Sequence, residues 1–129
     1  MIDSHCHLEQ KDYDSDRAEV IARCKKAGIK ALISVSASIH DFDKTLEIAA
    51  NNKNFVFTAA AAHPEYIKEL RDDELDAFFL KLRENRDNIV GIGECGLDYF
   101  WVKEKEFQEH QKELFAYIAF VSITFVPDQ

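Results

Sequence analysis

Ile2-Asp3-Ser4-His5-Cys6-His7 opens the chain and Gly91-Ile92-Gly93-Glu94 follows much later, and these two segments decide the fold. Side chains alternate between the faces of a strand, so His5 and His7 would point one way and Cys6 the other. Both segments read as buried strands that end in polar residues, and reactive groups of α/β folds gather at the carboxyl ends of parallel strands. We therefore expect both histidines and Glu94 to meet at one end of a parallel sheet.

Two imidazoles and a carboxylate form a ligand set that suits a divalent metal ion. Zinc, manganese and magnesium are the candidates, and three protein ligands leave positions open for water or substrate. A His-x-His pair by itself is a weak motif, because most isolated histidines are surface or core residues. Its position at a strand end favours a metal site formed by His5, His7 and Glu94.

The rest of the sequence alternates between short apolar runs and segments of helical periodicity. The runs predict strands at 30–35, 55–60 and 89–93, and the periodic segments predict helices after residues 14–16, from residue 41, from residues 72–73 and over 103–119. The expected buried helix positions are Ala18, Ile21 and Ala22 in the first helix, Leu75, Phe78, Phe79 and Leu82 in the third, and Phe107, Leu114 and Ile118 in the last. This alternation predicts an α/β fold with a parallel sheet covered by helices.

Two parallel architectures fit the pattern: a doubly wound open sheet, and the first part of an eight-stranded barrel. The chain has 129 residues, about half of the usual ~250 for a complete barrel. Ligands on the first and fourth strands converge naturally at the mouth of a barrel. The sequence therefore favours a partial TIM-type (β/α) barrel containing about the first four βα units.

Composition limits the possible functions. The length fits one domain, and the net charge of −8 gives no support for binding a polyanion, although a bound metal can invert the local sign. Cys6, Cys24 and Cys95 match no zinc or redox spacing and are expected to be reduced core residues. We find neither a secretion signal nor an apolar run of membrane-spanning length, and we expect a soluble cytoplasmic protein that does not bind membranes.

Three ordered motifs resemble the amino-terminal half of the TatD family of metal-dependent deoxyribonucleases. They are Asp3-Ser4-His5-Cys6-His7-Leu8, Ala62-His63-Pro64-Glu65 and Ile92-Gly93-Glu94-Cys95-Gly96-Leu97-Asp98-Tyr99, and Gln111-Lys112-Glu113-Leu114-Phe115 continues the likeness. The resemblance places the whole chain, residues 1–129, in one incomplete TatD-like domain. The likeness extends to about residue 118, and residues 119–129 form a divergent tail in which the run 120–126 reads as β-prone.

The resemblance implies an amidohydrolase-type barrel with two divalent metals that cleaves phosphodiester bonds, often trimming DNA from the 3′ end. His5 and His7 would bind the first metal, and Glu94 would be the catalytic carboxylate that bridges both metals. His63 would hold a substrate phosphate, or it would serve loop architecture beside Pro64.

The segment after Glu94 offers further candidates. Asp98 would orient a ligand or a water from behind the metal ligands. Residues 99–101, Tyr-Phe-Trp, could stack on bases, although packing or a hydrophobic lid is the favoured interpretation. We expect His40 and His110 to be helix or surface residues without a site role.

The family's later metal ligands, two histidines and an aspartate, have no counterpart in the chain. We therefore expect a truncated chain that binds one metal at most and has little or no activity. Its exposed sheet edges favour self-association. Two alternatives stay open: another metal hydrolase with a His-x-His strand, such as an amidohydrolase or a phosphoesterase, and a non-catalytic remnant that serves as a binding module.

Overall fold

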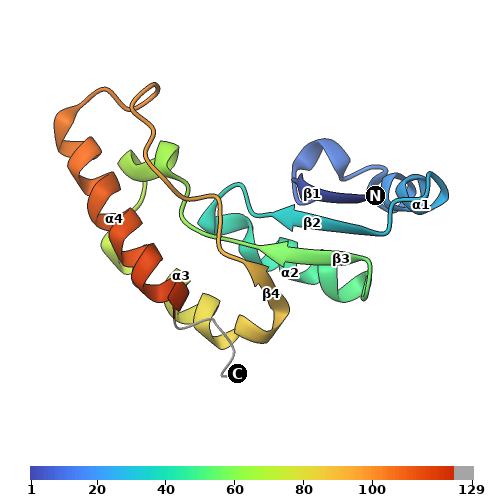
Figure 1. Ribbon diagram of the computed structural model, residues 1–129. Coiled ribbons are helices and arrows are strands. Elements are labelled where there is room, and N and C mark those ends of the chain that lie inside the picture. Colours follow the sequence, from blue (N-terminus) through green and yellow to red (C-terminus); the bar gives the residue numbers. More distant parts are fainter. Residues whose placement is uncertain (124–129) are drawn as a thin grey trace.

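The computed structural model describes residues 1–123 and shows strands and helices in strict alternation (Figure 1). The main elements are β1 (Ile2–Cys6), α1 (Arg17–Lys26), β2 (Ala31–Val35), α2 (Phe42–Asn51), β3 (Val56–Ala59), α3 (Asp72–Glu84), β4 (Ile89–Gly91) and α4 (Lys105–Ile123). Short 3-10 helices connect them: η1 (Lys11–Tyr13), η2 (Ile39–Asp41), η3 (Pro64–Lys68) and η4 (Arg86–Asn88). The predicted alternation is confirmed.

The sheet has the order β1-β2-β3-β4, and each neighbouring pair is parallel. The arrows of β1, β2 and β3 point the same way (Figure 1). A doubly wound sheet reverses its strand order at a switch point, whereas a barrel wall adds each new strand beside the previous one. The observed order therefore makes this chain the first four βα units of a barrel, as predicted.

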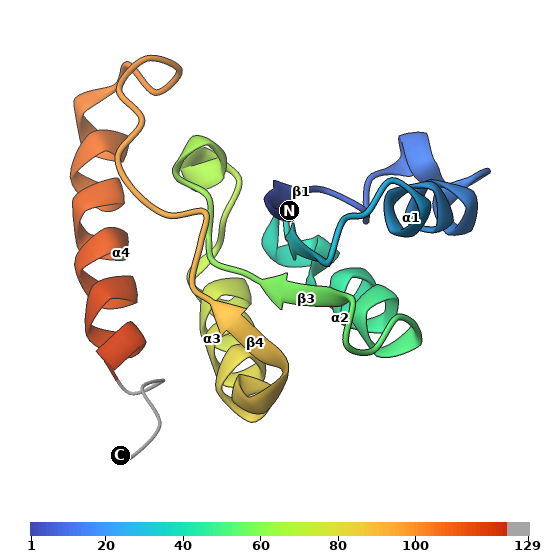
Figure 2. The same ribbon diagram turned by 45° about the vertical axis from the view of Figure 1, so that its right-hand side comes forward.

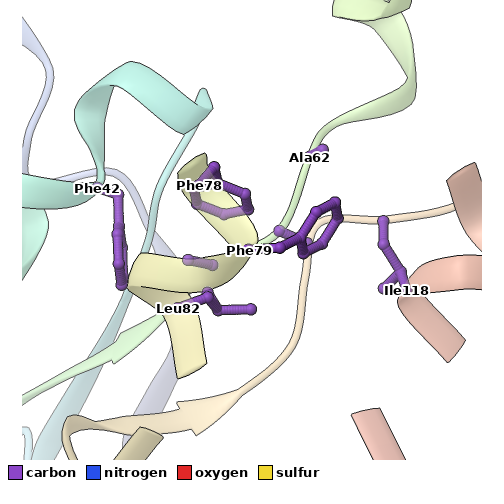
Figure 3. Packing of buried hydrophobic residues seen from close by; sticks show 8 residues of the cluster. Phe42, Ala62, Phe78, Phe79, Leu82 and Ile118 are labelled. Carbon is purple, nitrogen blue, oxygen red and sulfur yellow. The ribbon is translucent and has the colours of Figure 1, made fainter. Parts of the chain in front are cut away.

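Two apolar clusters hold the helices against the sheet. The larger one surrounds α3 (Figure 3) and contains Phe42, Ala60, Ala61, Ala62, Phe78, Phe79, Leu82 and Ile118, with Leu75 and Leu114 packed against it. The smaller one contains Leu8, Ile21, Leu32, Ile48, Phe55 and Val56. Leu82 is fully buried. The predicted face is confirmed for α3 and for Leu114 and Ile118 of α4, whereas Phe107 is half-buried and lies outside both clusters.

The expectation that the first and fourth strands are buried is wrong for β1. Residues 2–5 of this strand are exposed, and Val90 in β4 is 55% exposed. Both strands lie at the edges of the sheet, where a neighbouring strand and its helix are needed to cover them. Apolar runs in the sequence indicate which segments are strands of a parallel sheet, but they do not indicate which of these strands lie at its edges.

The predicted buried face of α1 is also only partly correct. Ile21 is buried, whereas Ala18 and Ala22 are exposed. Polar contacts hold the start of this helix, because the guanidinium of Arg17 donates to the carbonyls of Leu8 and Gln10. Ile21 alone joins the smaller apolar cluster as a buried residue of this helix, so a narrow apolar contact replaces the wide one that was expected.

Helix α4 is longer than predicted. The β-prone run 120–126 is helical as far as Ile123, and its residues 124–126 lie outside the described part of the chain. Val121 is buried three residues after Ile118, and the Ser122 hydroxyl donates to the Ile118 carbonyl at 2.7 Å. Burial at helical spacing therefore overrides the β propensity of this run. None of the described helices combines the length and apolarity needed to cross a membrane.

Candidate metal centre

His5, His7 and Glu94 come together at the carboxyl ends of the strands. His5 belongs to β1, His7 follows that strand directly, and Glu94 lies three residues after β4. Their ligand atoms all lie within 4.8 Å of one another. The Nε2 atoms of the two histidines are 3.2 Å apart, and Glu94 places Oε1 3.5 Å from His5 Nε2 and Oε2 3.8 Å from His7 Nε2.

This spacing fits the chemistry of a divalent ion. Ligand bonds of about 2.1 Å put neighbouring ligand atoms about 3.0–3.4 Å apart for angles between octahedral and tetrahedral. The three observed separations lie at or slightly above that range, so small side-chain movements suffice. The side chains of His5, His7 and Glu94 are 48%, 26% and 33% exposed, and the site is therefore open to water and substrate on one side.

A hydrogen bond fixes the tautomer of His7. Its Nδ1 lies 2.8 Å from the carbonyl oxygen of Val35 in β2, and because a carbonyl only accepts, Nδ1 carries the proton. The lone pair of Nε2 is thereby directed toward His5 and Glu94. Carbonyls and carboxylates behind a metal-binding imidazole commonly hold it in this way.

Glu9 is a second partner of His7, and the sequence analysis did not identify it. Its side chain is fully buried, with Oε1 3.5 Å from His7 Nδ1. The carboxylate also accepts from the Ala37 amide at 3.2 Å and from the Ser34 hydroxyl at 3.4 Å. Local sequence gives no signal for it, because β1 ends at Cys6 and Glu9 lies in the turn that follows.

The thiols face away from the centre, and no cysteine belongs to a ligand cluster in the described residues. Cys6 points to the opposite side, where its Sγ donates to the carbonyl of Ile33. Burial, with nearby Asp3 and Glu9, raises the pKa of Cys6 to about 12, and burial also raises the pKa of Cys95. Cys6, Cys24 and Cys95 pack against the apolar clusters, as expected for core residues.

His63 borders the centre and also shapes its own loop. Its Nε2 lies 3.9 Å from Glu94 Oε2. Its Nδ1 accepts from the Glu65 amide at 3.2 Å and so caps η3, in which Pro64 is the first residue. The two roles that the sequence left open, contact with the site and loop architecture, are compatible in this geometry.

Asp98 supports the backbone of the loop that follows Glu94. Its Oδ1 accepts from the amides of Phe100 and Trp101, both at 2.9 Å. In the described part of the chain this carboxylate makes no hydrogen bond or ion pair with His5, His7 or Glu94. The structure therefore brings His63 beside Glu94, and the expected role of Asp98 behind the ligands stays a prediction.

The aromatic residues 99–101 are exposed, so the packing role is wrong, whereas the hydrophobic lid, the other part of that expectation, stays a prediction. Tyr99, Phe100 and Trp101 are 40%, 69% and 65% exposed. His40 on η2 and His110 on α4 are exposed residues of helical elements, as predicted.

The chain forms part of the wall of a (β/α) barrel, and two imidazoles and a carboxylate meet at the carboxyl ends of its strands. It therefore belongs to the class of barrel proteins that carry a candidate metal site at the carboxyl-terminal face. Comparison with known families narrows this class. The model of the TatD related DNase family matches residues 2–124, and the chain belongs to this family.

Individual relatives agree with this assignment. The chain is 31% identical over 128 residues to the putative deoxyribonuclease tatdn3 of Danio rerio, covering 95% of the chain and 48% of that protein. It is 34% identical over 121 residues to an uncharacterized metal-dependent hydrolase of Buchnera aphidicola, covering 87% of the chain and 44% of that protein. It is 28% identical over 123 residues to the 3'-5' ssDNA/RNA exonuclease TatD of Dickeya dadantii, covering 95% of the chain and 44% of that protein.

Solved structures show the same fold. A TatD homolog from Escherichia coli, YJJV, superposes with a TM-score of 0.83 at 24% identity, over 97% of the chain and 47% of that structure. The chain thus spans about half the length of the relatives it matches.

Proposed function

We propose that the chain is a metal-dependent hydrolase of phosphodiester bonds that acts on DNA. The observation that carries the proposal is the set of ligand atoms of His5, His7 and Glu94, gathered within 4.8 Å in a member of the TatD related DNase family. The names of two relatives, a putative deoxyribonuclease and a metal-dependent hydrolase, support it.

The roles follow from the geometry. His5 and His7 would present their Nε2 atoms to magnesium, manganese or zinc, and Glu94 would complete the set. A bound divalent ion polarises a phosphoryl oxygen and lowers the pKa of a bound water. The Val35 carbonyl and Glu9 keep the proton of His7 on Nδ1, so that Nε2 stays available as a ligand.

Glu94 and His63 would act on the substrate side of the centre. The two oxygens of Glu94 face different partners, Oε1 toward His5 and Oε2 toward His7 and His63. A carboxylate with this orientation is suited to bridging two cations or to accepting a proton from a water molecule at the site. His63, with its Nε2 beside Oε2, would donate to a phosphate oxygen of the substrate.

We propose one ion per chain and slow cleavage. Within residues 1–123, His5, His7 and Glu94 are the one group whose ligand atoms could hold a metal ion. A single, partly exposed ion supplies less charge stabilisation to a phosphoryl group than a two-ion clamp. Trimming from the 3′ end, as the family resemblance implies, is the expected mode of attack.

Metal binding and cleavage of a labelled single-stranded DNA by the full chain test the proposal. Glu94→Gln removes a charged ligand, and we expect manganese affinity to fall by at least about 100-fold. Mutation of residues that only hydrogen-bond to metal ligands typically lowers metal affinity by about 10–100-fold, and the loss of a ligand itself should cost more. Glu113→Gln, an exposed glutamate on α4, is the matched control and should change neither binding nor cleavage.

The outcomes separate the alternatives. Cleavage that survives Glu94→Gln would exclude this residue from the site. A folded chain that binds no metal and cleaves no phosphodiester would favour the non-catalytic binding module. Hydrolysis of amide substrates in place of DNA would move the chain to the amidohydrolases.

We also propose that copies of the chain associate through the sheet edges. β1 and β4 lie at the edges, where Ile2 is 61% and Val90 55% exposed. Unpaired edges offer free backbone groups to a further strand. Size-exclusion chromatography with light scattering tests this, and a monomer over a wide concentration range would contradict it.

A further inference from the structure

The loop between β4 and α4 contains Glu94 and, six residues later, an exposed aromatic pair. Phe100 and Trp101 are 69% and 65% exposed, and their rings meet edge to face with centroids 4.8 Å apart. The loop leaves the sheet at the end toward which the strand arrows point, which is the end that carries the centre (Figure 2). Exposed aromatic side chains of this size are costly in water and commonly mark a binding surface.

The loop is held by a specific set of hydrogen bonds. Asp98 Oδ1 accepts from the amides of Phe100 and Trp101, which fixes the backbone that carries both rings. Gln111 of α4, which is 1% exposed, accepts from the Asp98 amide at 2.9 Å and donates to the Asp98 carbonyl at 3.2 Å. The aromatic rings are therefore presented to solvent on a supported backbone.

The same glutamine joins the loop to the centre. Gln111 Nε2 donates to the Pro64 carbonyl at 2.8 Å, and Pro64 follows His63, whose Nε2 lies 3.9 Å from Glu94. Glu94 and the aromatic pair lie in the same loop, which runs from residue 92 to residue 104. Phe100 is six residues after Glu94, at most about 21 Å of extended chain, so a strand of several nucleotides with one phosphate at the centre is long enough to extend to the aromatic pair.

The charge of the chain favours binding by base stacking over binding by phosphate contacts alone. The chain has a net charge of −8, which repels a polyanion as a whole. One cation accompanies the aromatic pair: Lys103 Nζ lies 4.9 Å from the centroid of the Phe100 ring and donates to the Tyr99 carbonyl. An exposed ring face with one local cation beside it matches a nucleobase and its adjoining phosphate.

We propose that Phe100 and Trp101 form a stacking platform for the unpaired bases of a single-stranded nucleic acid whose backbone reaches the metal centre. The inference rests on the proposed function for its substrate class. Asp98 and Gln111 are positioning residues in this scheme, because they hold the loop and do not touch the base. Single strands are preferred because the bases of a duplex are already stacked on one another.

Trp101 is the single tryptophan of the chain and reports on the platform directly. The full chain is titrated, in EDTA so that no metal contributes, with oligo(dT) of about ten nucleotides, with an abasic oligonucleotide of equal phosphate number, and with a duplex. We expect oligo(dT) to quench Trp101 emission and to bind about 5- to 100-fold more tightly than the abasic strand, the range expected for stacking of one base.

Two pairs of variants sharpen the test. Phe100→Ala should bring the ratio of oligo(dT) to abasic affinity close to one, whereas Phe120→Ala, an equally exposed aromatic on α4, should leave it unchanged. Asp98→Ala should lower the ratio by releasing the loop. Asp98→Asn should restore it, because an amide oxygen accepts the same two N–H bonds, and a circular dichroism spectrum verifies the fold of each variant.

Equal affinity for the oligo(dT) and abasic strands would overturn the inference, and so would equal quenching by the duplex. Trp101 emission that shifts with protein concentration alone, and not with oligo(dT), would assign the loop to contact between copies and equally overturn it. Base-dependent binding without metal-dependent cleavage would uphold the platform and refute the hydrolase. Cleavage with no base dependence would do the reverse.

Discussion

Replacing Gln111 by alanine is expected to destabilise the protein and loosen the loop that follows Glu94. Gln111 makes three hydrogen bonds, to the Pro64 carbonyl and to the amide and carbonyl of Asp98, at 2.8–3.2 Å. A buried hydrogen bond contributes about 0.5–1.5 kcal/mol net, and a buried group left without a partner costs about 1–3 kcal/mol. The loss should therefore be about 2–4 kcal/mol.

Thermal unfolding measures this loss. For a chain of this length, 1 kcal/mol shifts Tm by about 3–5 °C, so Gln111→Ala should melt roughly 10 °C below the parent. Gln108→Ala is the matched control on the same helix, because Gln108 Nε2 makes one bond, to the Val102 carbonyl at 2.9 Å. Its expected shift is about a third as large.

Hydrogen exchange adds a local readout. The Asp98 amide donates to Gln111 Oε1, so it should exchange faster in Gln111→Ala than in Gln108→Ala. The reasoning fails if both variants melt at the same temperature or if the exchange of this amide does not change. A large Tm loss with unchanged exchange would mean that Gln111 acts through packing rather than through its bonds to the loop.

Three further predictions address the metal site, the core and the thiols. Glu9→Gln should keep the fold, since an amide oxygen still accepts from the backbone, but should weaken zinc binding about 10–100-fold by removing the charge behind His7, as measured by calorimetry. Leu82→Ala should cost about 2–5 kcal/mol in chemical denaturation because Leu82 is fully buried, whereas Leu80→Ala, at a position 57% exposed, should change the free energy of unfolding by no more than about 0.5 kcal/mol. Burial raises the pKa of Cys6 from 9.0 to about 12, so the Cys6 thiol stays protonated in the folded state as the pH rises. Because only the thiolate reacts, the rate of Cys6 alkylation in the folded chain, followed by mass spectrometry, should increase about tenfold per pH unit up to about pH 12. A rate that levels off near pH 9 would refute the shift.

The convergence of the three candidate ligands could be predicted from the sequence because it depends on local geometry. His5 and His7 are two residues apart in an extended segment, and strand pleating alone puts both on one side. Glu94 follows the fourth strand of an alternating pattern, and parallel strands end at the same edge. Neither inference needs knowledge of distant packing.

Glu9 and Gln111 could not be found in this way. The importance of Glu9 depends on Ser34 and Ala37, which belong to β2 and the loop after it. Gln111 acts through Pro64 and Asp98, which lie far from it in the sequence. Both residues are polar, and a polar side chain becomes a buried support only when partners from other elements surround it.

The errors in the expected fold have a common physical cause. β1 was expected to be buried and is exposed, and the run beginning at Phe120 was expected to be β-prone and is helical as far as Ile123. Apolar content and β propensity describe what a segment can bury. Whether a neighbouring element covers it, as Ile118 and Val121 are covered, is decided by the packing of the whole domain.

The sequence by itself determined the alternation of strands and helices, the barrel type, the family and the residues that converge at the strand ends, because these follow from side-chain periodicity and ordered motifs. The tertiary structure decided which strands are edges, which nitrogen of His7 faces the centre, and that Asp98 supports a loop whose aromatic rings stay in solvent. These properties depend on contacts between segments distant in the chain, which periodicity does not encode.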